Sequence, residues 1–207
     1  MNILAHRGLW NAISEKNSLK SLKLSLDENF GLETDLRDFD GSLVISHDPI
    51  INRDNILLFE DLLKIYNESR SKATLALNIK TDGIMSEAEF LLDKFKIKNY
   101  FFFDMSVPEL ICAHKKNIKN IFCRNSEFES SEKVLHFSTG IWLDSFDGIH
   151  QNLKSLILNF LNKKKNIAIV SPELHVKDQK LIYNCWKEIK DLNIPEDSKK
   201  LLMLCTD

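Results

Sequence analysis

The sequence predicts an α/β fold, a minimal parallel (β/α)8 TIM barrel formed by a single domain over residues 1–207. Short apolar or β-branched runs, typical of buried strands, alternate with stretches whose apolar residues recur at helical spacing. Eight such runs result when 32–36 and 43–46 are counted as one strand extended by a turn at Asp40-Gly41. Six glycines, four prolines and the lack of any Ser/Gly-rich tract leave no convincing linker.

The expected strands alternate with helices in a regular order. Helical spacing is clear at Leu19, Leu22 and Leu26 and again over 181–192, whereas the stretch 127–136 is a weak helix. An open doubly wound sheet is the structural alternative, but no G-x-G-x-x-G follows the first run, so a dinucleotide site has no support. In chain order, the expected strands are 2–5, 32–36 with 43–46, 74–79, 100–103, 120–123, 140–143, 167–170 and 201–205.

Composition excludes several classes of protein. The chain carries 28 Lys and Arg against 30 Asp and Glu, a balance that gives no electrostatic footprint for nucleic acid. Its longest apolar stretches, such as 153–161, are too short to cross a membrane, and its first seven residues do not resemble a signal peptide. Four cysteines without a C-x-x-C motif favour reduced thiols and a cytoplasmic location. A membrane surface is a possible partner but not the expected one.

Acidic and basic side chains gather where the first three strands of the barrel end. Glu33 and Asp35 stand two residues apart on one strand, so both carboxylates point to the same face. Such a pair is a plausible half-shell for Mg²⁺ or Ca²⁺, although it could instead form ion pairs with Arg7 or Arg37. Arg7 and Lys80 place cations at neighbouring strand ends, and together these residues suggest a phosphate site.

Two histidines, His6 and His47, are expected at the same end of the barrel. Histidine titrates near neutral pH, so such a pair can take a proton from one oxygen and give one to another. Phosphodiester cleavage needs both transfers. The alternative for each is a buried histidine held by a hydrogen bond. Arg37 is interpreted as the outer partner of its neighbour Asp38.

Later strand ends offer weaker candidates. Trp142 and Glu173 are expected to contact substrate, because aromatic walls and polar groups commonly line ligand pockets. Trp142 is equally consistent with packing beneath a helix. His175 is more typical of a surface or hydrogen-bonded histidine, and Trp10 is expected either to cover the pocket mouth or to staple the first loop.

These motifs together resemble the glycerophosphodiester phosphodiesterase family. The resemblance is strong over residues 5–80 and thin afterwards. The family's pattern runs roughly H-R-G, P-E-N-T, E-x-D, D-G, H-D, E-I-K and a closing T-D. The matching residues here are His6-Arg7-Gly8, Asn17-Ser18, Gly31-x-Glu33-x-Asp35, Asp40-Gly41, His47-Asp48 followed by Arg53, Asn78-Ile79-Lys80 and Thr206-Asp207.

The resemblance implies a (β/α)8 barrel and metal-assisted hydrolysis of a glycerophosphodiester to glycerol phosphate and an alcohol. Asn78 stands where the family has a glutamate; its amide oxygen can still coordinate a metal, but with one negative charge fewer. By position, the resemblance assigns acid-base catalysis to His6 and His47, phosphate binding to Arg7 and Lys80, and divalent metal binding to Glu33, Asp35 and Asn78.

The resulting hypothesis is a cytoplasmic, divalent-metal-dependent phosphodiesterase acting on a small-molecule diester. Two alternatives stay open, a phospholipase D-like enzyme acting on a lipid phosphodiester and a barrel that binds phosphate without catalysis. At 207 residues, the chain ends with its eighth strand, so the eighth helix is apparently missing. We therefore expect an apolar flank on that strand, with either another subunit covering the seam or a sequence shortened from a longer gene.

Overall fold

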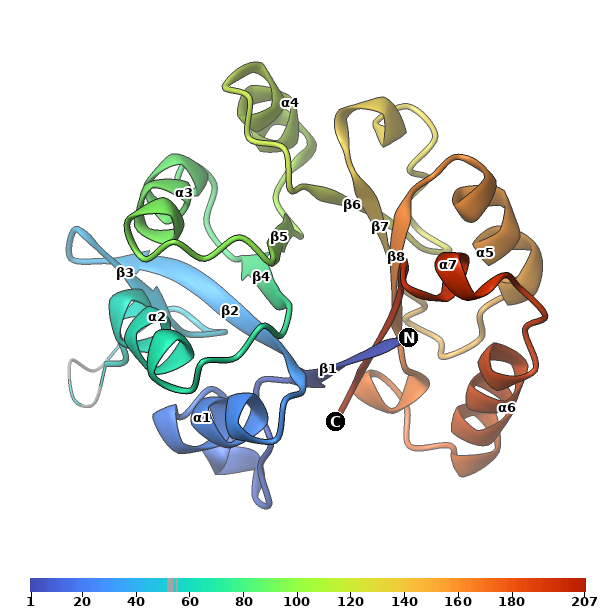
Figure 1. Cartoon of the computed structure of the whole chain (residues 1–207), viewed down its shortest axis with the longest axis horizontal. Helices are drawn as coiled ribbons and strands as arrows, with labels where there is room; N and C mark the ends of the chain where they lie inside the picture. The colour runs from blue at the N-terminus through green and yellow to red at the C-terminus, as the bar shows by residue number, and fades with distance from the viewer. Residues whose placement is uncertain (52–53, 55) are drawn as a thin grey trace. The chain divides into compact units, whose positions relative to one another are not determined.

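The computed structural model of the chain describes residues 1–51, 54 and 56–207 (Figure 1). These residues form two compact units, each considered by itself. The amino-terminal unit comprises Leu4–Ile121, and the carboxy-terminal unit comprises Met1–Ile3 with Phe122–Asp207. The first strand, β1 (Asn2–His6), therefore contributes residues to both.

In the amino-terminal unit, the parallel strands lie in the order β5-β4-β2-β1. Strand β3 is not part of this order and pairs antiparallel with β2 in a hairpin. All five residues of β4 are buried, as the near-continuous apolar runs predict for parallel strands covered on both faces. After β1, its elements are η1 (Ile13–Glu15), α1 (Leu19–Asp27), β2 (Gly31–Phe39), β3 (Ser42–Ile45), α2 (Phe59–Glu68), β4 (Leu75–Ile79), α3 (Met85–Lys94), β5 (Tyr100–Phe103) and α4 (Val107–Lys115).

Helix α1 illustrates how local sequence sets these elements. Ser18 is its N-cap, and the Ser18 hydroxyl accepts a hydrogen bond from the Ser21 backbone N–H at 3.2 Å. Leu22 and Leu26, four residues apart, are buried beneath it. The helix ends before Asn29, which adopts a left-handed φ of 59°. The predicted helical spacing is therefore confirmed here.

The β2–β3 hairpin corrects one detail of the prediction. The two runs counted as one extended strand are separate and antiparallel, with β3 outside the parallel ladder. The turn explains the reversal, because Asp40 and Gly41 have φ values of 51° and 76°, as a tight hairpin turn requires. The hairpin returns the chain to β2, where the Ser46 N–H donates to the Asp35 carbonyl oxygen at 3.1 Å.

The carboxy-terminal unit orders its parallel strands β9-β8-β7-β6. The sequence predicts at most a weak helix over 127–136, and this is confirmed. Among the residues described between β6 and β7, only the short 3-10 helix η2 (Leu135–Phe137) is helical. Its elements are β6 (Phe122–Asn125), η2 (Leu135–Phe137), β7 (Gly140–Leu143), α5 (Leu153–Asn162), β8 (Asn166–Val170), η3 (Pro172–Leu174), α6 (Gln179–Lys190), α7 (Glu196–Lys199) and β9 (Leu202–Thr206).

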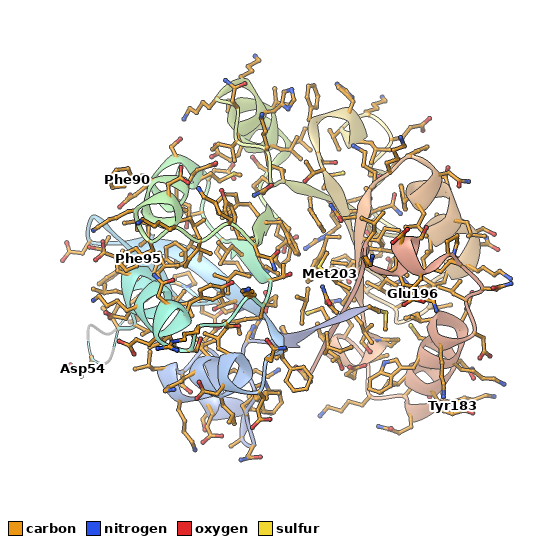
Figure 2. All side chains as sticks on the ribbon, in the orientation of Figure 1. Asp54, Phe90, Phe95, Tyr183, Glu196 and Met203 are labelled. Carbon is orange, nitrogen blue, oxygen red and sulfur yellow. The ribbon has the colours of Figure 1, made fainter. Side chains whose placement is uncertain are left out.

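A largely apolar groove of about 750 Å³ lies along the carboxy-terminal unit, where the sequence predicts an apolar flank on its last strand. Met1 and Ile3 line it from the start of the chain, Leu204 from β9, and Trp186 from α6. Tyr183, also on α6, lines it as well and is 65% exposed; its side chain is labelled in Figure 2. No helix within the described ranges is long and apolar enough to span a membrane.

Candidate functional site

The loop after β1 is built around two left-handed residues, Arg7 with φ 58° and Gly8 with φ 92°. A Cβ at Gly8 would lie 2.6 Å from the backbone carbon of Ser21, so only glycine lets α1 approach this closely. The Arg7 backbone N–H donates to the Glu33 carbonyl at 2.9 Å. His6 and Glu33 are register partners, and His6 Nε2 lies 3.9 Å from Glu33 Oε2. The predicted catalytic histidine therefore lies beside the acidic side chain of Glu33 on β2.

Asp35 is fully buried and is the centre of the predicted cluster. One of its oxygens lies 2.9 Å from Arg7 Nε, and the other lies 3.3 Å from Lys80 Nζ. Asn17 Nδ2 donates to Asp35 at 2.8 Å, while Asn17 Oδ1 accepts a hydrogen bond from the Thr34 hydroxyl at 2.8 Å. The ion pair with Arg7, which the sequence left open as an alternative to metal binding, is therefore present. Asn17 connects to Asp35 and Thr34, a role that its place in the sequence motif alone did not predict.

Glu33 is the electrostatically strained member of the cluster. Its side chain is only 2% exposed, and burial raises its pKa well above the ordinary value, as does the charge of Asp35. Arg7 and Lys80 oppose this shift, but they also neutralise Asp35. Two buried carboxylates thus share two cations, and a further cation bound here would favour the ionised form of Glu33.

Asn78 on β4 supplies an unsatisfied oxygen beside these carboxylates. It is the register partner of Asp35 and is 7% exposed. Its side-chain Oδ1 is buried and has no hydrogen-bond partner among the described residues. A buried carbonyl without a partner is costly, so this oxygen is suited to an incoming cation or donor.

The oxygen donors of Glu33, Asp35 and Asn78 fit a hard divalent cation such as Mg²⁺ or Ca²⁺, because such ions prefer carboxylate and amide oxygens. No group of three or more His, Cys, Asp or Glu side chains within the described ranges is arranged to hold a metal.

His47 follows β3 and lies on the segment that the hairpin returns to β2. Its Nδ1 is 2.8 Å from Asp48 Oδ1, and this hydrogen bond, with the His47 charge, lowers the pKa of Asp48. Arg37 Nη2 donates to the His47 carbonyl at 3.0 Å, so its hydrogen bond is directed to this segment rather than to Asp38 as the sequence suggested. Arg53, which belongs to the sequence motif, lies outside the described residues.

Trp10 staples the first loop, one of the two roles that the sequence left open. Its indole N–H donates to the His6 carbonyl at 3.1 Å. Lys16 Nζ lies 4.3 Å from the centre of the Trp10 ring, a cation–π contact that further fixes the loop. The staple therefore holds the backbone of the predicted catalytic histidine.

The carboxy-terminal unit contains the remaining candidates. Trp142 on β7 is 4% exposed, so its ring is part of the packed interior of its unit. The Glu173 carboxylate accepts hydrogen bonds from the hydroxyls of Ser171 and Thr206. Substrate contact by either residue stays a prediction.

A second cluster of acidic and basic side chains, formed by Asp144, His175 and Arg124, lies in the carboxy-terminal unit. Asp144 Oδ1 is 2.8 Å from His175 Nε2, and Arg124 Nε is 3.7 Å from Asp144 Oδ2. Burial opposes ionisation of Asp144, but the hydrogen bond and charge of His175, helped by Arg124, hold its pKa below the usual range. The same hydrogen bond raises the pKa of His175. His175 is therefore a hydrogen-bonded histidine, as its sequence context suggested.

Comparison with known proteins identifies the fold. No protein-family model matches the chain. No curated protein matches it either. Among solved structures, a glycerophosphodiester phosphodiesterase from Parabacteroides distasonis is 16% identical, with a TM-score of 0.74, covering 99% of this chain and 92% of that one.

Two further solved structures are similar. A glycerophosphodiester phosphodiesterase from Thermotoga maritima is 17% identical, with a TM-score of 0.66 over 98% of this chain and 93% of that one. An Oleispira antarctica phosphodiesterase, in complex with the product sn-glycerol-3-phosphate, is 14% identical, with a TM-score of 0.69 over 99% of this chain and 92% of that one. The predicted (β/α)8 TIM-barrel fold is confirmed by these similarities.

Proposed function

We propose that this chain is a phosphoric diester hydrolase that cleaves a glycerophosphodiester to a phosphomonoester and an alcohol. The observation that carries the proposal is the convergence of His6, Arg7, Glu33, Asp35 and Lys80 where β1 and β4 end beside the middle of β2. In a parallel barrel, the carboxyl ends of the strands are the position of the active site. The solved structures that share this fold include phosphodiesterases, one of them with sn-glycerol-3-phosphate bound.

Glu33, Asp35 and Asn78 would hold a divalent cation, Mg²⁺ or Ca²⁺, through their side-chain oxygens. When bound, such an ion would supply positive charge that polarises the phosphoryl group. The raised pKa of Glu33, caused by burial and by Asp35, supports a cation at this position.

Arg7 and Lys80 are the proposed phosphate ligands. Both side chains are partly buried and lie within 3.3 Å of the same carboxylate, which fixes the positions of their positive charges. The arginine fork can donate two hydrogen bonds to phosphate oxygens, and the lysine acts as a point charge. Their charges would offset the negative charge that develops on the phosphoryl oxygens in the transition state.

His6 and His47 are the proposed acid-base pair. One imidazole accepts the proton of the attacking oxygen, from water or from a hydroxyl of the substrate, as that oxygen forms its bond to phosphorus. The other imidazole donates a proton to the alkoxide that leaves as the original P–O bond breaks. Because Asp48 binds Nδ1 of His47, the Nε2 atom of His47 is the one available for proton transfer. If a substrate hydroxyl attacks, a cyclic phosphate forms first, and water then opens it.

Substrate contacts of Trp142 and Glu173 stay predictions from the sequence, and the substrate is proposed to be a small soluble diester met in the cytoplasm. Cys112 is exposed, while Cys123, Cys185 and Cys205 are buried. Reduced buried thiols are typical of cytoplasmic proteins, which supports this location.

Product analysis tests the reaction class. We expect ³¹P NMR of the protein with Mg²⁺ and glycerophosphocholine or glycerophosphoethanolamine to show conversion of the diester signal to a phosphomonoester signal. A transient cyclic phosphate would identify attack by the substrate's own hydroxyl. Retention of the diester signal across a panel of such compounds, with either Mg²⁺ or Ca²⁺, would contradict the proposal.

A further inference from the structure

The segment that carries His47 is attached to β2 by more than the hairpin ladder. In that ladder Leu36 pairs with Ile45 and Arg37 pairs with Val44. Beyond it, the Ser46 N–H donates to the Asp35 carbonyl at 3.1 Å. The ladder has therefore ended where His47 begins, and any further attachment must come from side chains.

Arg37 supplies such an attachment. Its Nη2 donates to the His47 carbonyl oxygen at 3.0 Å, across ten residues of sequence. The His47 side chain is itself 42% exposed, so packing alone restrains it weakly. A hydrogen bond from a charged donor is stronger than one between neutral groups and restrains the backbone directly beneath the imidazole.

The position of Arg37 on β2 links this attachment to the rest of the site. Glu33, Asp35 and Arg37 are spaced two residues apart on one strand, so their side chains leave the same face. Asp38, the next residue, is exposed and leaves the opposite face. One face of β2 thus carries the predicted metal ligands and the side chain that holds the predicted catalytic histidine.

We propose that Arg37 is a positioning residue that fixes the His47 backbone relative to Glu33 and Asp35 on β2. The consequence for catalysis rests on the proposed function above. Loss of the Arg37 donor lets the His47 imidazole sample orientations unsuited to proton transfer. Small misplacements of an acid-base group cost up to about 10²-fold in rate, whereas phosphate binding by Arg7 and Lys80 is unaffected.

Three variants test the proposal. Arg37→Met keeps the apolar stem but removes the donor, Arg37→Lys keeps a donor, and Asp38→Ala is the matched control on the opposite face. With Mg²⁺ present, we expect Arg37→Met to lower kcat on a glycerophosphodiester by about 10- to 100-fold. We expect KM and inhibition by sn-glycerol-3-phosphate to change by less than about threefold. Arg37→Lys should recover most of the lost kcat, because an ammonium can donate to the same carbonyl.

A second measurement does not depend on activity. Amide hydrogen exchange followed by NMR should show faster exchange at Ser46, whose N–H donates to the Asp35 carbonyl directly before His47, in Arg37→Met than in wild type, with no change in Asp38→Ala. Unchanged exchange would overturn the proposal whether or not the protein is active. A rise in KM with unchanged kcat would also overturn it, since Arg37 would then bind substrate. If wild type cleaves no diester, the proposed function fails, while the exchange measurement still tests the Arg37–His47 attachment.

Discussion

Both units bury acidic side chains beside basic ones, on or directly after parallel strands, but the two clusters differ in how many partners each acid has. In the carboxy-terminal unit, the buried Asp144 has His175 at 2.8 Å and Arg124 at 3.7 Å, and Arg124 also lies 3.3 Å from the exposed Glu129. In the amino-terminal unit, Glu33 and Asp35 share Arg7 and Lys80, and the pKa of Glu33 is raised by burial and by Asp35.

This difference is the basis of our proposal that one cluster stabilises the fold and the other binds a ligand. Asp144 has a lowered pKa, so despite burial its partners favour the charged form. Glu33 has the opposite shift, and the nearby Asn78 Oδ1 has no hydrogen-bond partner among the described residues. Incomplete satisfaction of buried polar groups is unfavourable for folding alone, and it is typical of sites where a ligand completes the set.

The largest effect should come from the histidines of the amino-terminal unit. Replacing His6 or His47 by Ala should lower kcat by at least about 10²-fold, given the usual contribution of acid-base groups. Steady-state assays of a glycerophosphodiester measure this directly. His114→Ala is the matched control, because His114 lies on α4 and is expected to have no role in the chemistry. Unchanged turnover in either catalytic variant would rule out its assignment.

Removing a carboxylate should weaken metal binding next most strongly. Glu33→Gln keeps the size of the side chain but removes a negative charge, so we expect Mg²⁺ or Ca²⁺ affinity to fall by about 10- to 100-fold. Isothermal titration calorimetry of the chelator-treated protein measures the change. Glu173→Gln, in the other unit, is the control. Equal affinities for wild type and Glu33→Gln would show that Glu33 does not bind the metal.

Adding a negative charge at position 78 should change metal affinity by a smaller amount and in the opposite direction. Asn78→Glu places a third carboxylate beside Asp35, and we expect divalent cation affinity to rise by about tenfold. Without metal, the added charge should lower the midpoint of thermal unfolding, because three buried carboxylates repel one another. A larger metal-induced rise in that midpoint than in wild type would support the assignment. Equal rises in both proteins would argue against Asn78 as a ligand.

The smallest effect on activity should come from the Asp144–His175–Arg124 cluster of the carboxy-terminal unit. Asp144→Asn should lower the free energy of unfolding by about 1–3 kcal/mol near pH 5.5 and change kcat by less than about threefold. The raised pKa of His175 means that its stabilisation is present below its unfolded pKa and is lost as pH rises through the folded one. The lowered pKa of Asp144 means that its contribution is present above its unfolded pKa and is lost as pH falls through the folded one.

The Asp144–His175 pair therefore stabilises most between the unfolded pKa values of its members, about pH 4 to 6.5. Urea unfolding of wild type and Asp144→Asn at pH 5.5 and pH 8.5 measures this. We expect the difference between the two proteins to be larger at pH 5.5. A difference that grows towards pH 8.5 would contradict the assigned charge states.

Much of the fold could be predicted because its strands and helices follow periodic patterns of apolar residues within short segments of the sequence. Buried parallel strands such as β4 and β8 are nearly continuous apolar runs, and their bounds agree with the predicted ones within a residue or two. The antiparallel return of β3 was not predicted, because apolar runs do not encode strand direction. That direction depends on the left-handed backbone of Asp40 and Gly41.

Part of the candidate site could also be predicted from periodic sequence patterns. Alternation on β2 placed Glu33 and Asp35 on one face, and the ion pairs of Asp35 with Arg7 and Lys80 follow from strand ends meeting at one edge. Asn17 and Arg37 reach their partners across loops, with contacts to Asp35 and to the His47 carbonyl. Such contacts depend on the three-dimensional path of the chain, and no spacing in the sequence encodes them.

The central claim is that the cluster of Glu33, Asp35 and Asn78 with Arg7 and Lys80 in the amino-terminal unit is a metal-dependent catalytic site. Its most direct test compares Asp35→Asn with Asp144→Asn on a panel of glycerophosphodiesters, assayed with chelator and after addition of Mg²⁺ or Ca²⁺. We predict that wild type and Asp144→Asn lose activity with chelator and regain it with metal, while Asp35→Asn stays at least about 10²-fold below wild type. Full activity of Asp35→Asn, or of wild type with chelator, would contradict the account.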